Sequence, residues 1–144
     1  MQEFDHVEKR KGAAAGWATQ IVGALLCLAV SAIHVVDQGG VPGSKTPTYI
    51  AALYWVLEIV GVVTAVLLFA GRVRLGWFLA MGVAAGPIAG YALSRGPGLP
   101  DFRSDVGNWT EPLGLVSLAV EGALLFLSAT CFLLGLRGPT RHMP

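Results

Sequence analysis

Residues 46–71 read TPTYIAALYWVLEIVGVVTAVLLFAG, an apolar stretch in which Glu58 is the only formally charged side chain. An α-helix rises about 1.5 Å per residue, so about 20 such residues cross the roughly 30 Å hydrocarbon core of a bilayer. Three further stretches are also long and apolar, and Glu121 is the only formally charged residue inside them. The sequence therefore predicts an all-α, polytopic membrane protein with transmembrane helices at about 12–36, 48–71, 75–94 and 112–136.

Composition agrees with this fold class. Of the 144 residues, 54% are hydrophobic and 13% are charged, and the mean hydropathy is +0.64. So little polar surface does not suit a water-soluble globule. With four spans and short connections, residues 1–144 are expected to form a single four-helix bundle domain, because irregular backbone is not tolerated in lipid. The net charge of +1 gives no reason to expect a nucleic-acid partner.

The distribution of Lys and Arg predicts the orientation of the bundle. If both termini lie on one face, that face carries seven basic residues and the opposite face three: Lys9, Arg10, Lys11, Arg72, Arg74, Arg137 and Arg141 against Lys45, Arg95 and Arg103. Basic residues favour the cytoplasmic side. We therefore expect a multi-pass protein of the plasma membrane with cytoplasmic termini and an outward-facing loop over residues 95–111.

Each predicted helix carries small or polar residues at spacings of three and four, which place them on one helical face. Such faces allow membrane helices to approach closely, so we expect these stripes to face inward. On the third helix the stripe is a doubled G-x-x-x-G motif made by Gly82, Gly86 and Gly90. This motif is interpreted as a helix-packing surface.

The two intramembrane glutamates are the strongest functional signal. Glu58 and Glu121 both lie roughly 15 Å from the outer ends of their helices, near the bilayer midplane. A carboxylate there costs about 2.5–3.5 kcal/mol on insertion scales, so it is normally protonated, paired or functional. We expect a buried polar cluster and, above it, an outer mouth. The cluster comprises Glu58, Glu121, Tyr54, Ser117 and Ser31, and the mouth comprises His34, Asp37, Tyr91, Arg95, Asp105 and Glu111.

Two interpretations of the glutamates stay open. They can be protonated donors in interhelical hydrogen bonds, or they can bind a ligand, a proton or a cation. His34, Asp37, Glu58 and Glu121 offer a mixed nitrogen and oxygen set for a metal, but His34 is expected about 10 Å above the glutamates by helical rise, so we assign no metal site. A haem with His34 as single axial ligand also remains open. The sequence requires no cofactor.

No catalytic residue is predicted. The chain contains no G-x-S-x-G, H-E-x-x-H, C-x-x-C or phosphate-loop motif, so enzymatic function is not favoured. The outer loop instead places Phe102 and Trp109 among charged residues and prolines. Aromatic anchors with charged surroundings are typical of protein interfaces, which predicts a partner-docking role, although both rings also suit an aromatic belt at the membrane surface.

Residues 90–121, GYALSRGPGLPDFRSDVGNWTEPLGLVSLAVE, together with SAIHVV around His34 and with Glu58, carry a resemblance to a known group. The chain resembles small uncharacterised four-helix membrane proteins of high-GC actinobacteria. The resemblance implies that the outer loop and the start of the fourth helix are the distinctive surface. It implies no reaction type.

Three function classes follow from these observations. The first is a small accessory subunit that docks to a larger membrane assembly through its G-x-x-x-G face and outer loop. The second is a small transporter or channel in which Glu58 and Glu121 bind a proton or cation. The third is a metal- or haem-binding redox protein that uses His34 and the acids. The expected partners are the lipid bilayer and other membrane subunits, or a second copy of the chain.

Overall fold

The computed structural model describes the backbone of residues 2–41 and 43–136, and the side chains of residues 16–41 and 43–135. Within these residues the chain is helical and contains no β-strand beyond one isolated bridge. Its helices are α1 (Gln2–Asp37), α2 (Thr48–Phe69), α3 (Val73–Arg95) and α4 (Pro112–Leu136). Each contains a segment long and apolar enough to cross a membrane. The predicted all-α class with four membrane-length helices is confirmed.

The largest difference from the predicted bounds is at the start of α1. This helix begins at Gln2, ten residues before the predicted start at Gly12. Residues 2–15 contain no proline, and nine of these fourteen residues are Gln, Glu, Lys, Arg or Ala, which are good helix formers, so the helix continues past its apolar part. The side chains of Lys9, Arg10 and Lys11, and the whole of Arg137 and Arg141, lie outside the described residues.

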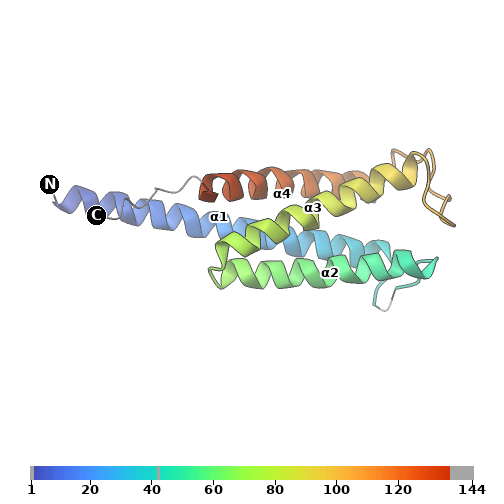
Figure 1. Ribbon diagram of the computed structural model, residues 1–144, viewed down its shortest axis with the longest axis horizontal. Helices are drawn as coiled ribbons and strands as arrows, with labels where there is room; N and C mark the ends of the chain where they lie inside the picture. Colours follow the sequence, from blue (N-terminus) through green and yellow to red (C-terminus); the bar gives the residue numbers. More distant parts are fainter. Residues whose placement is uncertain (1, 42, 137–144) are drawn as a thin grey trace.

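The helices run alternately up and down, and α3 crosses the others obliquely (Figure 1). The most extensive contacts join α1 with α2 and α3 with α4, whereas within the described chain α2 and α4 do not approach each other. We call the end that carries residues 38–47 and 96–111 the loop end, and the end that carries residues 70–72 the turn end. The start of α1 and the end of α4 both lie at the turn end (Figure 1).

Buried apolar side chains pack together toward the turn end. Trp77 on α3 is 2% exposed and belongs to a buried core with Ala24, Leu68 and Leu124. A Cβ atom added at Gly23 would overlap the Trp77 ring, so this glycine is what admits the indole. The missing side chain of Gly23 therefore makes room for Trp77 between α1 and α3 in this half of the bundle.

The loop between α3 and α4 folds back over the bundle. Leu99 and Phe102 exchange two backbone hydrogen bonds of 3.0 Å across a tight turn, in which Asp101 has φ 54°. Proline followed by a residue that tolerates the left-handed region suits such a turn. The Tyr49 hydroxyl donates to the Pro100 carbonyl at 2.5 Å and ties the turn to the start of α2. The loop is thereby held over the loop end.

Candidate binding cavity

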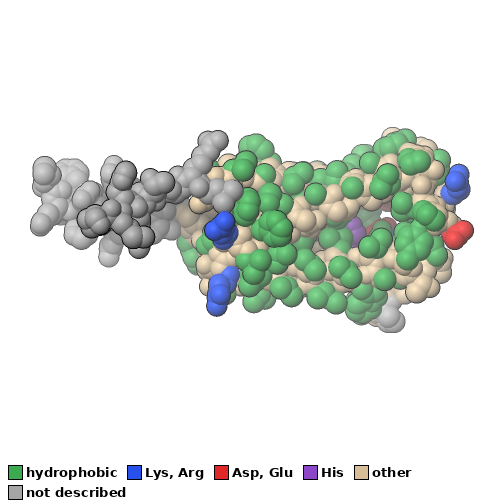
Figure 2. Space-filling model, viewed as in Figure 1, with side chains coloured by type: hydrophobic (Ala, Val, Ile, Leu, Met, Phe, Trp, Pro, Cys, Tyr) green, Lys and Arg blue, Asp and Glu red, His purple; other side chains and the backbone are tan. Residues whose placement is uncertain are grey.

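A cavity of about 650 Å³ lies in the loop-end half of the bundle. All four helices and the outer loop contribute to its lining. It exists because α3 leaves α2 as it crosses toward α4, and Figure 2 shows the hollow between hydrophobic side chains near the loop end, with the histidine visible inside it. Small-molecule sites in proteins typically measure about 300–1,000 Å³. The cavity therefore has the dimensions of a ligand site.

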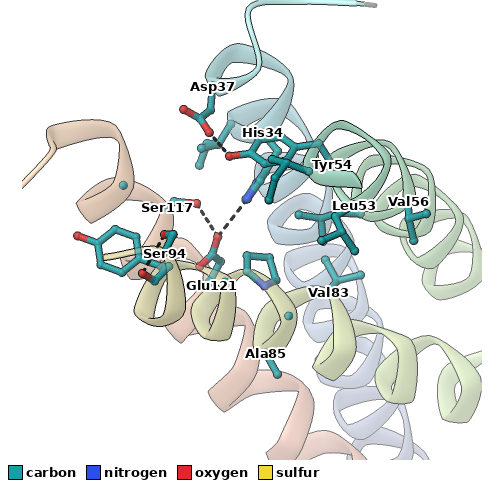
Figure 3. Close-up of a pocket in the computed structure, with 18 of the residues that line it drawn as sticks. His34, Asp37, Leu53, Tyr54, Val56, Val83, Ala85, Ser94, Ser117 and Glu121 are labelled. Carbon is teal, nitrogen blue, oxygen red and sulfur yellow. Dashed lines mark hydrogen bonds and ion pairs between the residues drawn. The ribbon is translucent and has the colours of Figure 1, made fainter. Parts of the chain in front are cut away.

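The lining is divided into an apolar part and a polar part. Aliphatic and aromatic side chains of α2 and α3 form most of the apolar part, including Leu53, Val56, Leu57, Phe78 and Val83. The polar groups come mainly from α1, α4 and the loop-end part of α3 (Figure 3). Such a division matches a ligand with an apolar body and a polar head.

The glycine stripe of α3 forms part of this lining. Gly82, Gly86 and Gly90 all line the cavity, and no atom lies within 4 Å of a Cβ built at any of them. The prediction that they pack against another helix is therefore wrong for the described helices of this chain. Residues on other faces of α3, including Gly76, Ala80 and Ala84, are buried instead. Because glycine has no side chain, a row of glycines widens the groove beside it where no other helix packs into that groove.

Glu121 occupies the polar end of the cavity. Its side chain comes from α4, is 1% exposed and accepts a hydrogen bond of 2.5 Å from the Ser117 hydroxyl through Oε1. The same Oε1 lies 3.9 Å from His34 Nε2 on α1. The two side chains point toward each other (Figure 3). No described residue donates a hydrogen bond to Oε2, so this oxygen is available to a ligand.

The short distance between His34 and Glu121 corrects the predicted separation of about 10 Å. That prediction counted the helical rise between backbone positions alone. Side chains on a helix tilt toward its N-terminus. Because α1 and α4 run in opposite directions, His34 tilts toward the turn end and Glu121 toward the loop end, and the two tilts close the gap.

The imidazole of His34 is held in one tautomer. Its Nδ1 lies 2.9 Å from the Val30 carbonyl oxygen, and since a carbonyl only accepts, Nδ1 carries a proton. Nε2 is therefore the nitrogen that faces Glu121. Atoms 3.9 Å apart are too distant for a direct hydrogen bond, but both can contact one ligand atom at ordinary distances of about 2.8 Å.

Asp37, at the end of α1, belongs to a second polar group nearer the loop end. It accepts a hydrogen bond from the Tyr54 hydroxyl (Figure 3). Its Oδ2 also forms an ion pair with Lys45 Nζ at 3.2 Å. The Tyr54 ring lies 5.3 Å from the His34 ring, between centroids. Tyr54 thus connects this group to the His34–Glu121 pair.

Arg95 holds the third polar group together. Its guanidinium lies 3.3 Å from Glu111 and 3.9 Å from Asp105, and it stacks over the Tyr91 ring at 3.9 Å. Its Nε donates to the Asn108 carbonyl at 2.9 Å. Glu111 in turn accepts from the backbone N–H of Gly114 at 2.8 Å, at the first turn of α4. Arg95 therefore links α3, the outer loop and α4.

Glu58 does not join these groups. It is 7% exposed and buried, but it is absent from the cavity lining, and its Oε1 has no hydrogen-bond partner in the described chain. The neighbouring Gln38 amide, 1% exposed, also has none. Ser31 donates to the Glu58 backbone carbonyl at 3.2 Å rather than to its carboxyl. The predicted single cluster is thus two groups, one in the cavity and one between α1 and α2.

The four residues considered as metal ligands do not lie together in the structure. His34 and Glu121 meet, whereas Asp37 is engaged by Tyr54 and Lys45, and Glu58 lies outside the cavity lining. Among the described residues, no three His, Cys, Asp or Glu side chains converge as metal ligands would.

The two aromatic residues of the outer loop have different surroundings. Phe102 is partly buried and lines the cavity. Trp109 is 48% exposed, and its ring contacts Tyr91 edge-on with centroids 6.0 Å apart. Phe102 therefore covers the cavity and Trp109 lies more exposed beside it, and the docking role of the two rings stays a prediction.

Sequence reasoning missed the cavity itself. A stripe of glycines has the same sequence pattern whether it packs against a helix or faces a groove. Only the path of α3 in the structure distinguishes these two cases. No known protein family, no curated protein and no solved structure matches the chain. The geometry of the cavity is therefore the basis for a functional proposal.

Proposed function

We propose that the chain spans the plasma membrane four times and binds a small amphipathic molecule in the cavity. The proposed topology places both termini in the cytoplasm and the loop end outside. It is supported by the seven-to-three distribution of basic residues, and two of the seven, Arg72 and Arg74, are exposed at the turn end. In a bilayer the hollow between α2 and α3 then faces the lipid of the outer leaflet, which gives a lipid-soluble molecule lateral access.

One observation carries this proposal: the cavity has the volume of a ligand site, and its lining consists of an apolar part and a polar part. A space of about 650 Å³ meets apolar side chains on α2 and α3 and a buried, hydrogen-bonded carboxyl group on α4. An apolar body bound against α2 and α3 places its polar head beside Glu121, Ser117 and His34. Binding sites commonly combine such a large apolar surface with few polar groups that fix orientation.

Filling the cavity tests the proposal. Gly86→Leu adds a side chain at a position where a new Cβ meets no atom within 4 Å, so the bundle should fold while the cavity loses volume. We expect native mass spectrometry of wild-type protein from membranes to detect a bound small molecule that is lost in this variant. Gly135→Leu is the matched control, because it is also a helical glycine with open surroundings, outside the lining. Equal ligand retention in both variants contradicts the proposal.

A docking role as an accessory subunit is our second candidate. Trp109 supports it, because this large aromatic side chain is 48% exposed at the loop end although it is anchored there by Tyr91. Trp109→Ala should then release a partner subunit during co-purification and leave the cavity's ligand bound. Unchanged co-purification removes this candidate.

A further inference from the structure

We propose that the cavity binds lipophilic cations, and that each bound cation displaces a proton from the His34–Glu121 pair. This inference rests on the proposed function and names the chemical class of its ligand. Three features of the lining support it: the balance of charges, the aromatic rings, and the absence of a fixed positive charge at Glu121 among the described residues.

The cavity lining is rich in acidic groups. Four carboxyl groups line it, Asp37, Asp105, Glu111 and Glu121, against the single guanidinium of Arg95. Arg95 is shared between Asp105 and Glu111, and Lys45 neutralises Asp37 from outside the lining. This excess of negative charge favours the binding of cations over anions.

Of the four acids in the cavity lining, Glu121 is the one without a permanently charged partner among the described residues. In the described chain its one ion-pair contact is His34 at 3.9 Å, a group that is charged only when protonated. The other ionisable groups of the lining lie in the two outer groups described above. They are Asp37 on α1, Tyr54 on α2, Tyr91 and Arg95 on α3, and Asp105 and Glu111 in the loop. A ligand cation can supply the missing charge.

The cost of burying charge determines the proton content of the pair. An intramembrane site with a net charge is strongly disfavoured. The His34–Glu121 pair is neutral overall when it holds one dissociable proton, either as carboxylic acid with neutral imidazole or as carboxylate with imidazolium. One monovalent cation can replace that proton without changing the total charge. The exchange is therefore balanced: the protonated pair and the cation give the carboxylate–cation complex and a proton released to water.

The apolar part of the lining fits the body of such a ligand. Four aromatic rings line the cavity together with aliphatic side chains: those of Phe78 and Phe102, and those of Tyr54 and Tyr91, over which Lys45 and Arg95 already lie. Aromatic faces attract cations in addition to covering apolar surface. Organic cations with aromatic or alkyl substituents match both properties, whereas small hydrated cations match only the charge.

Two ions of nearly the same shape and opposite charge test the proposal. Tetraphenylphosphonium and tetraphenylborate should be compared by equilibrium dialysis with the full-length protein in neutral detergent. We expect the phosphonium to bind about 30-fold or more tightly than the borate, and Glu121→Gln to weaken phosphonium binding by a similar factor. In wild-type protein, phosphonium binding should release about one proton in weakly buffered solution, and affinity should rise as pH rises.

The outcomes separate this inference from the proposed function. If both ions bind equally and Gly86→Leu blocks both, the cavity binds amphipathic molecules but the assignment to cations is wrong. If neither ion binds and no native ligand is found, the proposed function fails as well. If Glu121→Gln does not fold, proton release by the wild-type protein decides alone, and phosphonium binding without proton release overturns the exchange.

Discussion

Single residues decide where the helices of this protein touch. The pattern of small and polar residues identified buried positions on α1, α2 and α4, such as Ser31, Glu58 and Ser117, because one face of a helix repeats every three or four residues. It did not identify the contact of His34 with Glu121. That contact depends on side-chain direction in two antiparallel helices, which spacing along one helix does not contain.

The glycines provide a residue-scale prediction. A Cβ at Gly61 would collide with Ser31 Oγ and approach the Cys27 carbonyl, whereas a Cβ at Gly82 meets nothing within 4 Å. Gly61→Ala should therefore destabilise the protein by about 1–3 kcal/mol through overpacking. Gly82→Ala should be neutral or stabilising by up to about 1 kcal/mol, since alanine favours the helix. Unfolding in mixed micelles measures both changes, and equal effects would contradict the assigned packing.

At the scale of elements, α3 determines what the bundle contains. The sequence predicted the start of α3 to within two residues and its end to within one, because apolar length and flanking arginines mark a membrane span. Its oblique path was not predictable from the same signals. The G-x-x-x-G motif favours close packing and a glycine-lined groove equally, and the choice depends on Trp77, Ala80 and Ala84, which pack another face of α3.

The outer loop is the second element that shapes the cavity, and Arg95 holds it in place through Glu111, Asp105 and Asn108. Arg95→Gln removes the charge, so the loop should open more often. We expect trypsin to cleave after the exposed Arg103 about tenfold faster, which corresponds to about 1.4 kcal/mol of local stability. Arg74→Gln at the turn end is the control. An unchanged cleavage rate in Arg95→Gln would show that other contacts hold the loop.

At the scale of the whole molecule, the fold class was predictable because four apolar segments leave few alternatives in a bilayer. The proposed orientation rests on a different property, the distribution of charge, and it is tested by labelling. Ser104→Cys, in a chain whose native Cys27 and Cys131 are replaced by alanine, should react with a membrane-impermeant maleimide in intact cells. Val73→Cys at the turn end should react only after permeabilisation. The reverse pattern means that the bundle is inserted in the opposite sense.

The central claim is that a ligand occupies the cavity with its charged centre beside Glu121. Crystals of the protein grown with tetraphenylarsonium test it directly, because the anomalous signal of arsenic locates the cation without assumptions about the rest of the ligand. The account predicts one strong peak enclosed by α2, α3 and the outer loop, adjacent to the Glu121 carboxylate and His34 Nε2. A peak on the lipid-facing surface, or an unoccupied cavity at saturating arsonium, would contradict it.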